Sequence, residues 1–376
     1  MEKKKTGAGL SENAAPLSPE HPLTADASGR FTAALLDWYR VHARDLPWRH
    51  TCDPYLIWVS EIMLQQTRVA AVLGYYARFL DAFPTVAALA DAPEEKLLSL
   101  WQGLGYYSRA RNLRRAANII KERGAFPDTY EELLSLPGIG AYTAGAIASA
   151  AFGRPAPAVD GNVLRVMTRL TDNHGDIQSP AVRREIETYA RDLFPESPDD
   201  RRIFNQALME LGATVCVPNG PPQCGRCPVA AHCLARERGT ASGLPVRAPK
   251  KARRVEARTV FLLLRDGQTA LRKRPDSGLL AGLWEFPNVE GVLTESEIAD
   301  AVTSWGLTVT QWRGKFNAKH IFTHVEWRMT GYLLSVTGTD NQNFAWADAQ
   351  ALREYAVPSA FARFRETVSK EIGENV

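Results

Sequence analysis

The stretch that decides the fold reads Leu136-Pro137-Gly138-Ile139-Gly140, and Val159-Asp160-Gly161-Asn162-Val163 follows about twenty residues later. The first motif separates a helical pattern ending near Ser135 from one beginning near Ala141. Gly138 and Gly140 permit close backbone approach to another molecule, and the amides that open the next helix suit a phosphate. Such a turn can also merely join two helices. The second motif adds a lone carboxylate, Asp160, which can cap a helix and also stabilise developing positive charge beside a cleft.

Apolar residues recur at helical spacing on both sides of this hairpin. The segments are 31–42, 54–72, 94–101, 106–123, 129–135, 141–152, 162–170, 180–193 and 200–213, and Pro, Gly, Asp and Asn mark their ends. The pattern predicts an all-α domain over residues 30–235. Residues 1–29 are rich in Ala, Ser, Pro, Gly and charge, which predicts a disordered tail.

The chain changes character after residue 235. Residues 236–257 hold a run of basic residues and two prolines, which predicts a basic linker. Beyond it, β-branched and aromatic residues predict strands at 258–264, 269–274, 326–336 and 344–346, with helices near 295–305 and 359–370. Residues 258–376 are therefore predicted to form a second domain of the α+β class.

The bulk composition fits two globular domains, with 376 residues, 45% hydrophobic and 23% charged. No apolar run is long enough for a membrane span, and the Lys3-Lys4-Lys5 start leads into no secretory signal. We expect a protein of the cytoplasm or nucleoid with no membrane partner. The net charge of only +3 makes global charge a weak argument for a polyanionic ligand.

Four of the five cysteines crowd into a short segment, at Cys216, Cys224, Cys227 and Cys233. In a chain of this class the spacing indicates a metal site rather than disulfides. Four thiolates can hold either tetrahedral zinc or a four-iron cluster, and spacing alone does not choose between them. The lone Cys52 is expected to be buried.

Further segments extend the two opening motifs, namely Leu46-Pro47-Trp48-Arg49, Asp53-Pro54-Tyr55 and Trp58-Val59-Ser60-Glu61-Ile62-Met63-Leu64-Gln65-Gln66-Thr67. Together they resemble the helix-hairpin-helix, Gly/Pro-Asp superfamily of DNA glycosylases, and within it the MutY-type adenine DNA glycosylases. The resemblance implies that Glu61 is the catalytic acid and that Asp160 stabilises the oxocarbenium-like sugar, with Asn162 and Tyr142 beside them. It also favours a [4Fe–4S] cluster on the four cysteines, although the first gap holds one residue more than the family usually has.

Glu61 makes chemical sense without the resemblance. It lies in the predicted helix that begins at Pro54, among Ile57, Trp58 and Met63, where desolvation raises the pKa of a carboxyl group toward that of a useful acid. An ordinary surface glutamate is the alternative. Position 142 separates two mechanisms, because bifunctional relatives carry there a Lys that attacks the sugar. Tyr142 offers no amine, which indicates a monofunctional enzyme.

The resemblance assigns several further positions. It places Gln66 and Tyr106 in or beside the DNA base stack, and Arg49 and Glu210 in the adenine pocket. In the second domain, the segment Gly278 to Pro287 resembles the entry to a Nudix fold, but Pro275 to Trp312 contains no Arg or Lys, so the hydrolase box is missing. Phe322-Thr323-His324 resembles the Phe-Ser-His element that reads 8-oxoguanine, with Thr in place of Ser.

The expected protein is therefore multi-domain, with an all-α glycosylase domain and four-cysteine cluster followed by an α+β Nudix-like domain. We expect a monomer that excises adenine from double-stranded DNA containing A:8-oxoguanine or A:G mispairs. Two alternatives stay open. One is a related thymine or uracil mismatch glycosylase, against which the Phe322–His324 element argues. The other is a catalytically silent DNA-binding repair factor, against which Glu61 and Asp160 argue.

Overall fold

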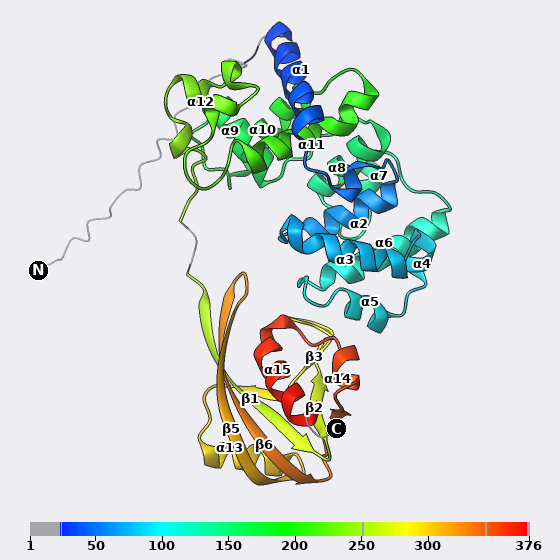
Figure 1. Ribbon diagram of the computed structural model, residues 1–376, viewed down its shortest axis with the longest axis vertical. Helices are drawn as coiled ribbons and strands as arrows, with labels where there is room; N and C mark the ends of the chain where they lie inside the picture. The colour runs from blue at the N-terminus through cyan, green and yellow to red at the C-terminus, as the bar shows by residue number, and fades with distance from the viewer. Residues whose placement is uncertain (1–22, 24, 250–251, 343, 374–376) are drawn as a thin grey trace, which may run out of the picture. The chain divides into compact units, whose positions relative to one another are not determined.

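The computed structural model describes residues 23, 25–249, 252–342 and 344–373 (Figure 1). The chain divides into two compact units. Unit 1 comprises residues 1–61 and 125–249, and unit 2 comprises residues 62–124 and 250–376. None of the helices in the described ranges is long and apolar enough to cross a membrane.

Unit 1 is helical, as the apolar spacing predicts. Its core includes Phe31 and Leu35 of α1, Met167 of α9, and Phe204 and Leu208 of α11, all fully buried. The elements are α1 (Ala25–His42), α2 (Pro54–Leu64), α7 (Tyr130–Leu134), α8 (Ala141–Phe152), α9 (Gly161–Leu170), α10 (Pro180–Asp192), α11 (Pro198–Thr214) and α12 (Leu234–Glu237), with short 3-10 turns at Pro47–Arg49, Cys224–Arg226, Ala230–His232 and Ala241–Gly243. The last turn of α2, from Ile62, belongs to unit 2.

The predicted disordered tail over residues 1–29 lies mostly outside the described residues. For residues 25–29 the prediction is wrong, because α1 begins at Ala25. Leu23 is buried and Ala27 packs against the core of unit 1. Asp26 and Arg30 form an ion pair one turn apart on the helix surface. Leu23 and Ala27 thus contact the core from a segment whose composition alone is typical of disorder.

Helix α8 packs closely because its residues are small. Its sequence is AYTAGAIASAAF, and every residue from Thr143 to Ala151 is buried. A Cβ atom built on Gly145 would lie 2.2 Å from the backbone oxygen of Pro157, so only glycine permits this approach. This packing fixes the first turn of α8, which carries Tyr142.

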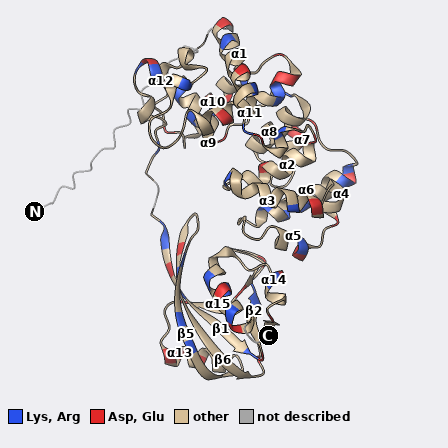
Figure 2. Ribbon diagram, viewed as in Figure 1, with Lys and Arg blue, Asp and Glu red and all other residues tan. Residues whose placement is uncertain are grey.

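Residues 62–124 of unit 2 form four further helices, whose basic and acidic residues are coloured in Figure 2. They are α3 (Val69–Ala82), α4 (Val86–Ala90), α5 (Glu94–Leu100) and α6 (Ser108–Arg123). Phe79 and Trp101 are fully buried and meet edge to face, with ring centroids 5.9 Å apart.

Two predicted helix boundaries in this part of the chain are wrong. The pattern over 54–72 predicts one helix, but α2 ends at Leu64, Gln66 adopts a φ of +59°, and α3 begins at Val69. Likewise α6 begins at Ser108 rather than 106, because Tyr106 has a φ of +47°. Apolar periodicity runs through both breaks and therefore cannot reveal them.

The predicted basic linker over residues 236–257 is wrong at both ends, because α12 extends to Glu237 and β1 begins at Arg254. Residues 234–237 form α12, and Ala235, Ala241 and Leu244 make a small buried cluster. The backbone N–H of Ile177 also donates to the carbonyl of Val246 (3.2 Å). The apolar residues among the basic ones therefore make residues 236–246 part of the fold of unit 1.

The C-terminal part of unit 2 is a mixed sheet with helices on both faces, which confirms the predicted α+β class. The strand order is β3-β2-β1-β6-β5, with β4 paired to β1 and β7 to β2. The central pair, β1 and β6, runs parallel. The elements are β1 (Arg254–Arg265), β2 (Gln268–Lys273), β3 (Trp284–Glu285), β4 (Asn288–Glu290), α13 (Glu295–Ser304), β5 (Leu307–Ile321), β6 (Val325–Gly338), β7 (Ala345–Ala347), α14 (Ala351–Glu354) and α15 (Ala362–Gly373).

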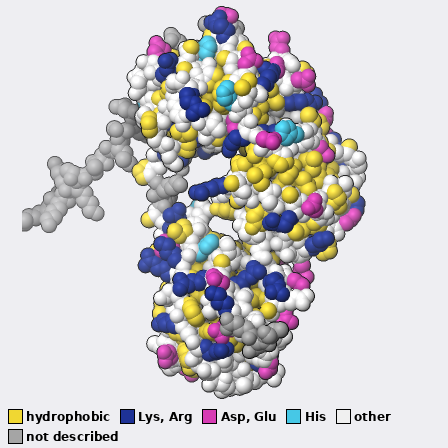
Figure 3. Space-filling view, viewed as in Figure 1, with side chains coloured by type: hydrophobic (Ala, Val, Ile, Leu, Met, Phe, Trp, Pro, Cys, Tyr) yellow, Lys and Arg dark blue, Asp and Glu magenta, His cyan; other side chains and the backbone are white. Residues whose placement is uncertain are grey.

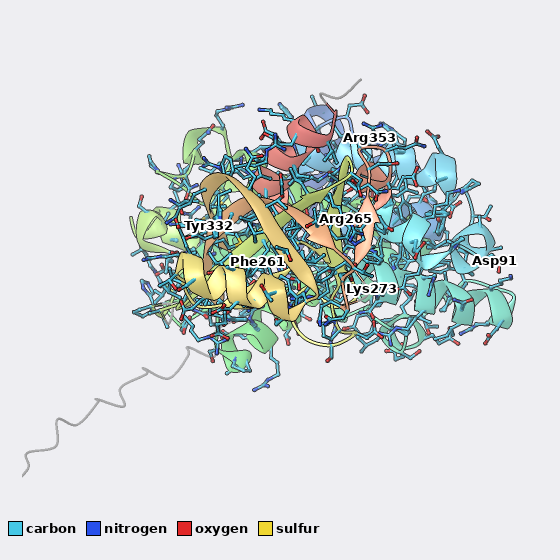
Figure 4. The ribbon with its side chains drawn as sticks, turned by 90° about the horizontal axis from the view of Figure 1, so that it is seen from below. Asp91, Phe261, Arg265, Lys273, Tyr332 and Arg353 are labelled. Carbon is cyan, nitrogen blue, oxygen red and sulfur yellow. The ribbon has the colours of Figure 1, made fainter. Side chains whose placement is uncertain are left out.

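Alternation along the central strands produces a separate core on each face of this sheet. Phe261 and Tyr332, labelled in Figure 4, belong to the core that includes Ile298 and Val302 of α13. Leu262 and Trp327 belong to the core on the other face, which includes Phe364 of α15. The two helices therefore cover opposite faces.

The sequence prediction missed β5, a strand of 15 residues. Most of its side chains are exposed or only partly buried, so it lacks the apolar run that marks a buried strand. It pairs antiparallel with β6. The hairpin turn contains Thr323 and His324, where the backbone N–H of Phe322 donates to the carbonyl of Val325 (2.8 Å).

Candidate active site

Glu61 lies near the C-terminal end of α2, partly exposed, next to fully buried Ser60 and Val59. Its carboxylate Oε2 accepts a hydrogen bond of 2.6 Å from the Tyr142 hydroxyl. Desolvation is the largest influence and raises the pKa of Glu61 to about 7, although the Tyr142 hydrogen bond opposes it. Nearby Asp160 raises this pKa further, and Arg49 lowers it. Glu61 is thus a carboxyl group that can hold a proton near neutral pH.

Tyr142 comes from the helical hairpin, in the first turn of α8. Burial raises its pKa well above the ordinary value of 10.0, and the negative charges of Glu61 and Asp160 act in the same direction. The hydroxyl therefore stays protonated and donates to Glu61. It also contacts the Met209 sulfur of α11 at 3.7 Å. The side chain links three helices that lie far apart in sequence.

Asp160 caps the N-terminus of α9, as its position before an apolar helix predicts. Its Oδ1 accepts from the backbone N–H groups of Asn162 and Val163, both at 2.8 Å, and its Oδ2 accepts from the Asn162 side-chain amide at 2.7 Å. Burial raises the pKa of Asp160, and these hydrogen bonds oppose the rise. The carboxylate is held rigidly beside the Glu61 site, with which it interacts electrostatically.

Asn162 is itself held by residues that the sequence prediction missed. Arg165 donates to the Asn162 side-chain oxygen (2.9 Å), to the carbonyl of Gly212 (2.6 Å) and to the carbonyl of Cys216 (2.7 Å). A Cβ atom on Gly212 would lie 2.7 Å from the Cβ of Asn162, so α11 approaches α9 at this point only because residue 212 is glycine. These contacts span about fifty residues of sequence and leave no local signal.

Arg49 and Glu210, both expected in the adenine pocket, form an ion pair that Arg44 shares. Glu210 has no exposed surface, and it accepts from Arg44 Nε (2.7 Å), Arg44 Nη2 (2.8 Å) and Arg49 Nη2 (2.6 Å). Burial opposes ionisation, but the hydrogen bonds from Arg44 and Arg49 overcome it and lower the pKa of Glu210 to about 2. Arg49 keeps 11% of its side chain exposed. Glu210 therefore fixes the positions of the Arg44 and Arg49 guanidinium groups.

The hairpin turn requires glycine at one of its two positions. Gly138 has a φ of +78°, whereas Gly140 has extended backbone and occupies the N-cap of α8 without a side-chain hydrogen bond. A Cβ atom on Gly140 would meet nothing within 4 Å, so the backbone there faces open space. Such a bare helix N-terminus is suited to an anionic group.

The four clustered cysteines line a single cavity, between α9 and the loop that follows α11. Arg169 lines it as well and donates to the Cys216 sulfur at 3.1 Å. Burial raises the pKa of the Cys227 thiol to about 12. Within the described ranges, no group of three or more His, Cys, Asp or Glu side chains is arranged around one metal ion. Cys52, expected to be buried, is exposed.

The remaining predicted residues belong neither to the group around Glu61, Tyr142 and Asp160 nor to the cysteine cavity. Gln66 and Tyr106 are both exposed, Tyr106 to 47%, and both have positive φ. At the β5–β6 turn, the Phe322 ring packs against Trp327, with centroids 4.9 Å apart, while Thr323 and His324 are exposed. The turn thus presents a hydroxyl and an imidazole above an aromatic base.

Comparison with known proteins agrees with this architecture. Residues 59–192 match the family model of the HhH-GPD superfamily base excision DNA repair protein, and residues 259–367 match that of the NUDIX domain. A thermostable thymine-DNA glycosylase of known structure is similar, with a TM-score of 0.50 and 29% identity, over 56% of this chain and 97% of that one.

Curated relatives extend over most of the sequence. The adenine DNA glycosylase of Homo sapiens is 38% identical, over 82% of this chain and 67% of its own. That of Rattus norvegicus is 36% identical, over 93% of this chain and 80% of its own. The chain therefore belongs to the adenine DNA glycosylase family, whose members are DNA N-glycosylases of base excision repair.

Proposed function

We propose that this enzyme excises adenine mispaired with 8-oxoguanine or guanine, with Glu61 as the general acid and Asp160 as the anion that stabilises the sugar cation. One observation carries the proposal. Glu61, with a pKa of about 7, receives the Tyr142 hydrogen bond and lies within electrostatic reach of Asp160, whose carboxylate is fixed at the start of α9. Paired carboxyl groups in such different surroundings are typical of an acid and an anionic stabiliser.

The chemistry follows from the substrate. Protonation of the adenine ring by Glu61 weakens the glycosidic bond, and the bonding electrons leave with the base. The sugar then carries positive charge, which the Asp160 carboxylate stabilises until water adds at the anomeric carbon. The ionised Glu61 accepts the proton that the water loses. The adenine must first leave the base stack to reach these groups.

Tyr142 supports a monofunctional reaction. Its position corresponds to that of the amine in lyase-competent relatives, but a tyrosine hydroxyl with a raised pKa forms no Schiff base. Its hydrogen bond instead fixes the Glu61 carboxyl group. Arg49, held by Glu210, is the partly exposed polar group that can line an adenine pocket.

The cysteine cavity supports a [4Fe–4S] cluster as the resident group, held by Cys216, Cys224, Cys227 and Cys233. Four sulfur atoms around a cavity suit a body of several atoms better than one tetrahedral ion. When bound, the cluster supplies structural cross-links and no step of the reaction. The residues at this cavity hold the loop after α11 against α9, since Arg169 also donates to the carbonyl of Val217 (3.1 Å).

Substitution of Glu61 by Gln is expected to lower adenine release from an A:8-oxoguanine duplex by roughly 10²- to 10⁴-fold, because a proton donor is lost with little change of volume. Asp160→Asn should have a similar effect. Single-turnover strand cleavage after hot alkali measures both, and duplex affinity should stay near that of the wild type. Glu131→Gln, an exposed carboxylate of the same hairpin, is the matched control. Thymine release by the wild type, or normal adenine release by Glu61→Gln, would contradict the proposal.

The single-turnover rate should fall about tenfold per pH unit above pH 7, because the acid form of Glu61 disappears above its pKa. Tyr142→Phe removes a hydrogen bond that lowers this pKa, so the alkaline limb should move upward by roughly one pH unit. Rates from pH 5.5 to 9 test the shift. Tyr130→Phe in the neighbouring helix should leave the profile in place. A downward shift for Tyr142→Phe would show that Glu61 is not the titrating acid.

Reading of the oxidised base is expected at the β5–β6 turn. Loss of a well-placed base contact removes roughly 1–3 kcal/mol of discrimination. Thr323→Ala and His324→Ala should therefore slow excision from A:8-oxoguanine more than from A:G, and Thr323→Ser should behave like the wild type. Thr308→Ala, an exposed residue elsewhere on β5, is the control. Equal losses of excision rate on the two duplexes would mean that the turn contributes general DNA affinity and does not recognise 8-oxoguanine.

The purified protein is expected to contain about four irons per chain, with broad visible absorption. Cys227→Ser should lose both, since it removes one thiolate from the cavity. Cys52→Ser should retain both, since Cys52 is exposed and outside the cavity. Metal analysis and the visible spectrum decide the question, and stoichiometric zinc without iron would refute the cluster assignment.

A further inference from the structure

Gln66 and Tyr106 share a backbone feature that is rare outside glycine. In the described residues only five non-glycine residues have positive φ, and these two are among them, at +59° and +47°. An L-residue in this region is strained, and it keeps that conformation only when its surroundings impose it. The two residues lie in different turns, one between α2 and α3 and the other between α5 and α6. Around these turns, hydrophobic side chains gather on the visible surface over α3 and α6 (Figure 3).

A single guanidinium group joins these two turns. Arg109 of α6 is only 9% exposed, and its Nη1 donates to the carbonyls of Ile62 (2.6 Å), Met63 (3.2 Å) and Gln65 (2.6 Å). Its Nη2 donates to the carbonyls of Leu104 (2.9 Å) and Gly105 (3.2 Å). Every one of these acceptors is a backbone carbonyl.

Two of the five carbonyls explain the strain. The carbonyl of Gln65 belongs to the peptide group that precedes Gln66, and the carbonyl of Gly105 belongs to the one that precedes Tyr106. When Arg109 fixes these peptide planes, it restricts the rotation that sets φ of the following residue. The Arg109 Cζ also lies 5.5 Å from the centre of the Tyr106 ring, which adds a cation–π contact.

The site is built for a guanidinium ion and not for a generic cation. Burial lowers the pKa of Arg109, but only to about 10, so the group stays charged at neutral pH. The two Nη groups donate hydrogen bonds to carbonyls in two separate turns, which the planar guanidinium group of arginine permits. An ammonium group has three donors around one nitrogen and cannot span both sets.

We propose that Arg109 is a positioning residue, which holds Gln66 and Tyr106 in the left-handed conformation in which they enter the DNA base stack. The inference rests on the proposed function, together with the expectation from the family resemblance that these two residues lie in or beside the base stack. Arg109 itself touches neither the reacting atoms nor the Glu61 carboxyl group. Its action is to preorganise two turns of the protein before DNA binds, so that the duplex meets a rigid pair of side chains.

The backbone half of the proposal is tested without DNA. Because Gln66 is held at positive φ, Gln66→Gly should unfold at a higher temperature than Gln66→Ala when Arg109 is present. In the Arg109→Lys background the turn can relax, and the difference between the Gly and Ala variants should shrink or vanish. Thermal unfolding of the four proteins completes the cycle. An undiminished difference in the Lys background would overturn the proposal.

The DNA half uses 2-aminopurine placed beside an A:8-oxoguanine mispair, whose fluorescence rises when the base stack opens. In stopped-flow mixing, Arg109→Lys should open the stack on the order of 10- to 100-fold more slowly than the wild type, as expected for misplaced contact groups. Arg115→Gln is the control, because it removes a charge from an exposed position of α6. Wild-type opening by a folded Arg109→Lys protein would overturn the proposal.

Adenine excision and base-stack opening together distinguish failure of the proposed function from failure of the positioning role of Arg109. If the wild-type protein excises adenine but Gln66→Ala and Tyr106→Ala open the stack normally, the assignment of these residues to DNA is wrong and the positioning role falls with it. If the wild type excises no adenine, the proposed function fails, while the Gly and Ala cycle still decides whether Arg109 imposes the backbone conformation.

Discussion

The desolvation of the Glu61 carboxyl group, without a hydrogen-bonded cation beside it, is the constraint on which the proposed site depends. Glu61 receives its close hydrogen bond from the neutral Tyr142 hydroxyl, and its pKa rises to about 7, whereas Glu210 receives two arginines and its pKa falls to about 2. At neutral pH, Glu61 is therefore about half protonated, whereas Glu210 is fully ionised. The first arrangement costs folding free energy. A carboxyl whose folded pKa is raised stabilises the protein below about pH 4.5, and this contribution disappears as the pH rises through 7, a loss of about 3 kcal/mol.

Helix α9 connects the proposed chemistry to the cysteine loop. Its N-terminus carries Asp160, its first turn carries Asn162, and Arg165 and Arg169 reach from it to Cys216. The side chain that fixes the Asp160 neighbour is therefore the same one that binds the backbone of the loop. Arg165 therefore connects the proposed cluster site to Asn162, which in turn donates to the Asp160 carboxylate.

Local chemistry made part of this predictable. Asp160 as a helix cap and Glu61 as a desolvated acid follow from the residues on either side of them, and the helices of unit 1 follow from apolar spacing. The residues that support these groups, such as Arg109 and Gly212, could not be recognised from their neighbours in the sequence. Arg109 acts on carbonyls more than forty positions away, and Gly212 is needed only because α9 passes beside it. The strand β5 escaped detection for the converse reason, since neither of its faces is deeply buried. Boundaries at Leu64 and Ser108 depend on tertiary hydrogen bonds, which periodicity does not contain.

The position of β5 at the end of the strand order has a consequence for solubility. Its outer edge is left without a partner strand among the residues the structure describes, and an open edge of 15 residues invites pairing with another molecule. Arg313, Lys315 and Lys319 place positive charge along it, and the register is interrupted twice, between Val309 and Gln311 and between Trp312 and Gly314. Charge and irregular register both oppose edge-to-edge pairing with a strand of another molecule. The same features that leave β5 without a buried face thus protect its open edge.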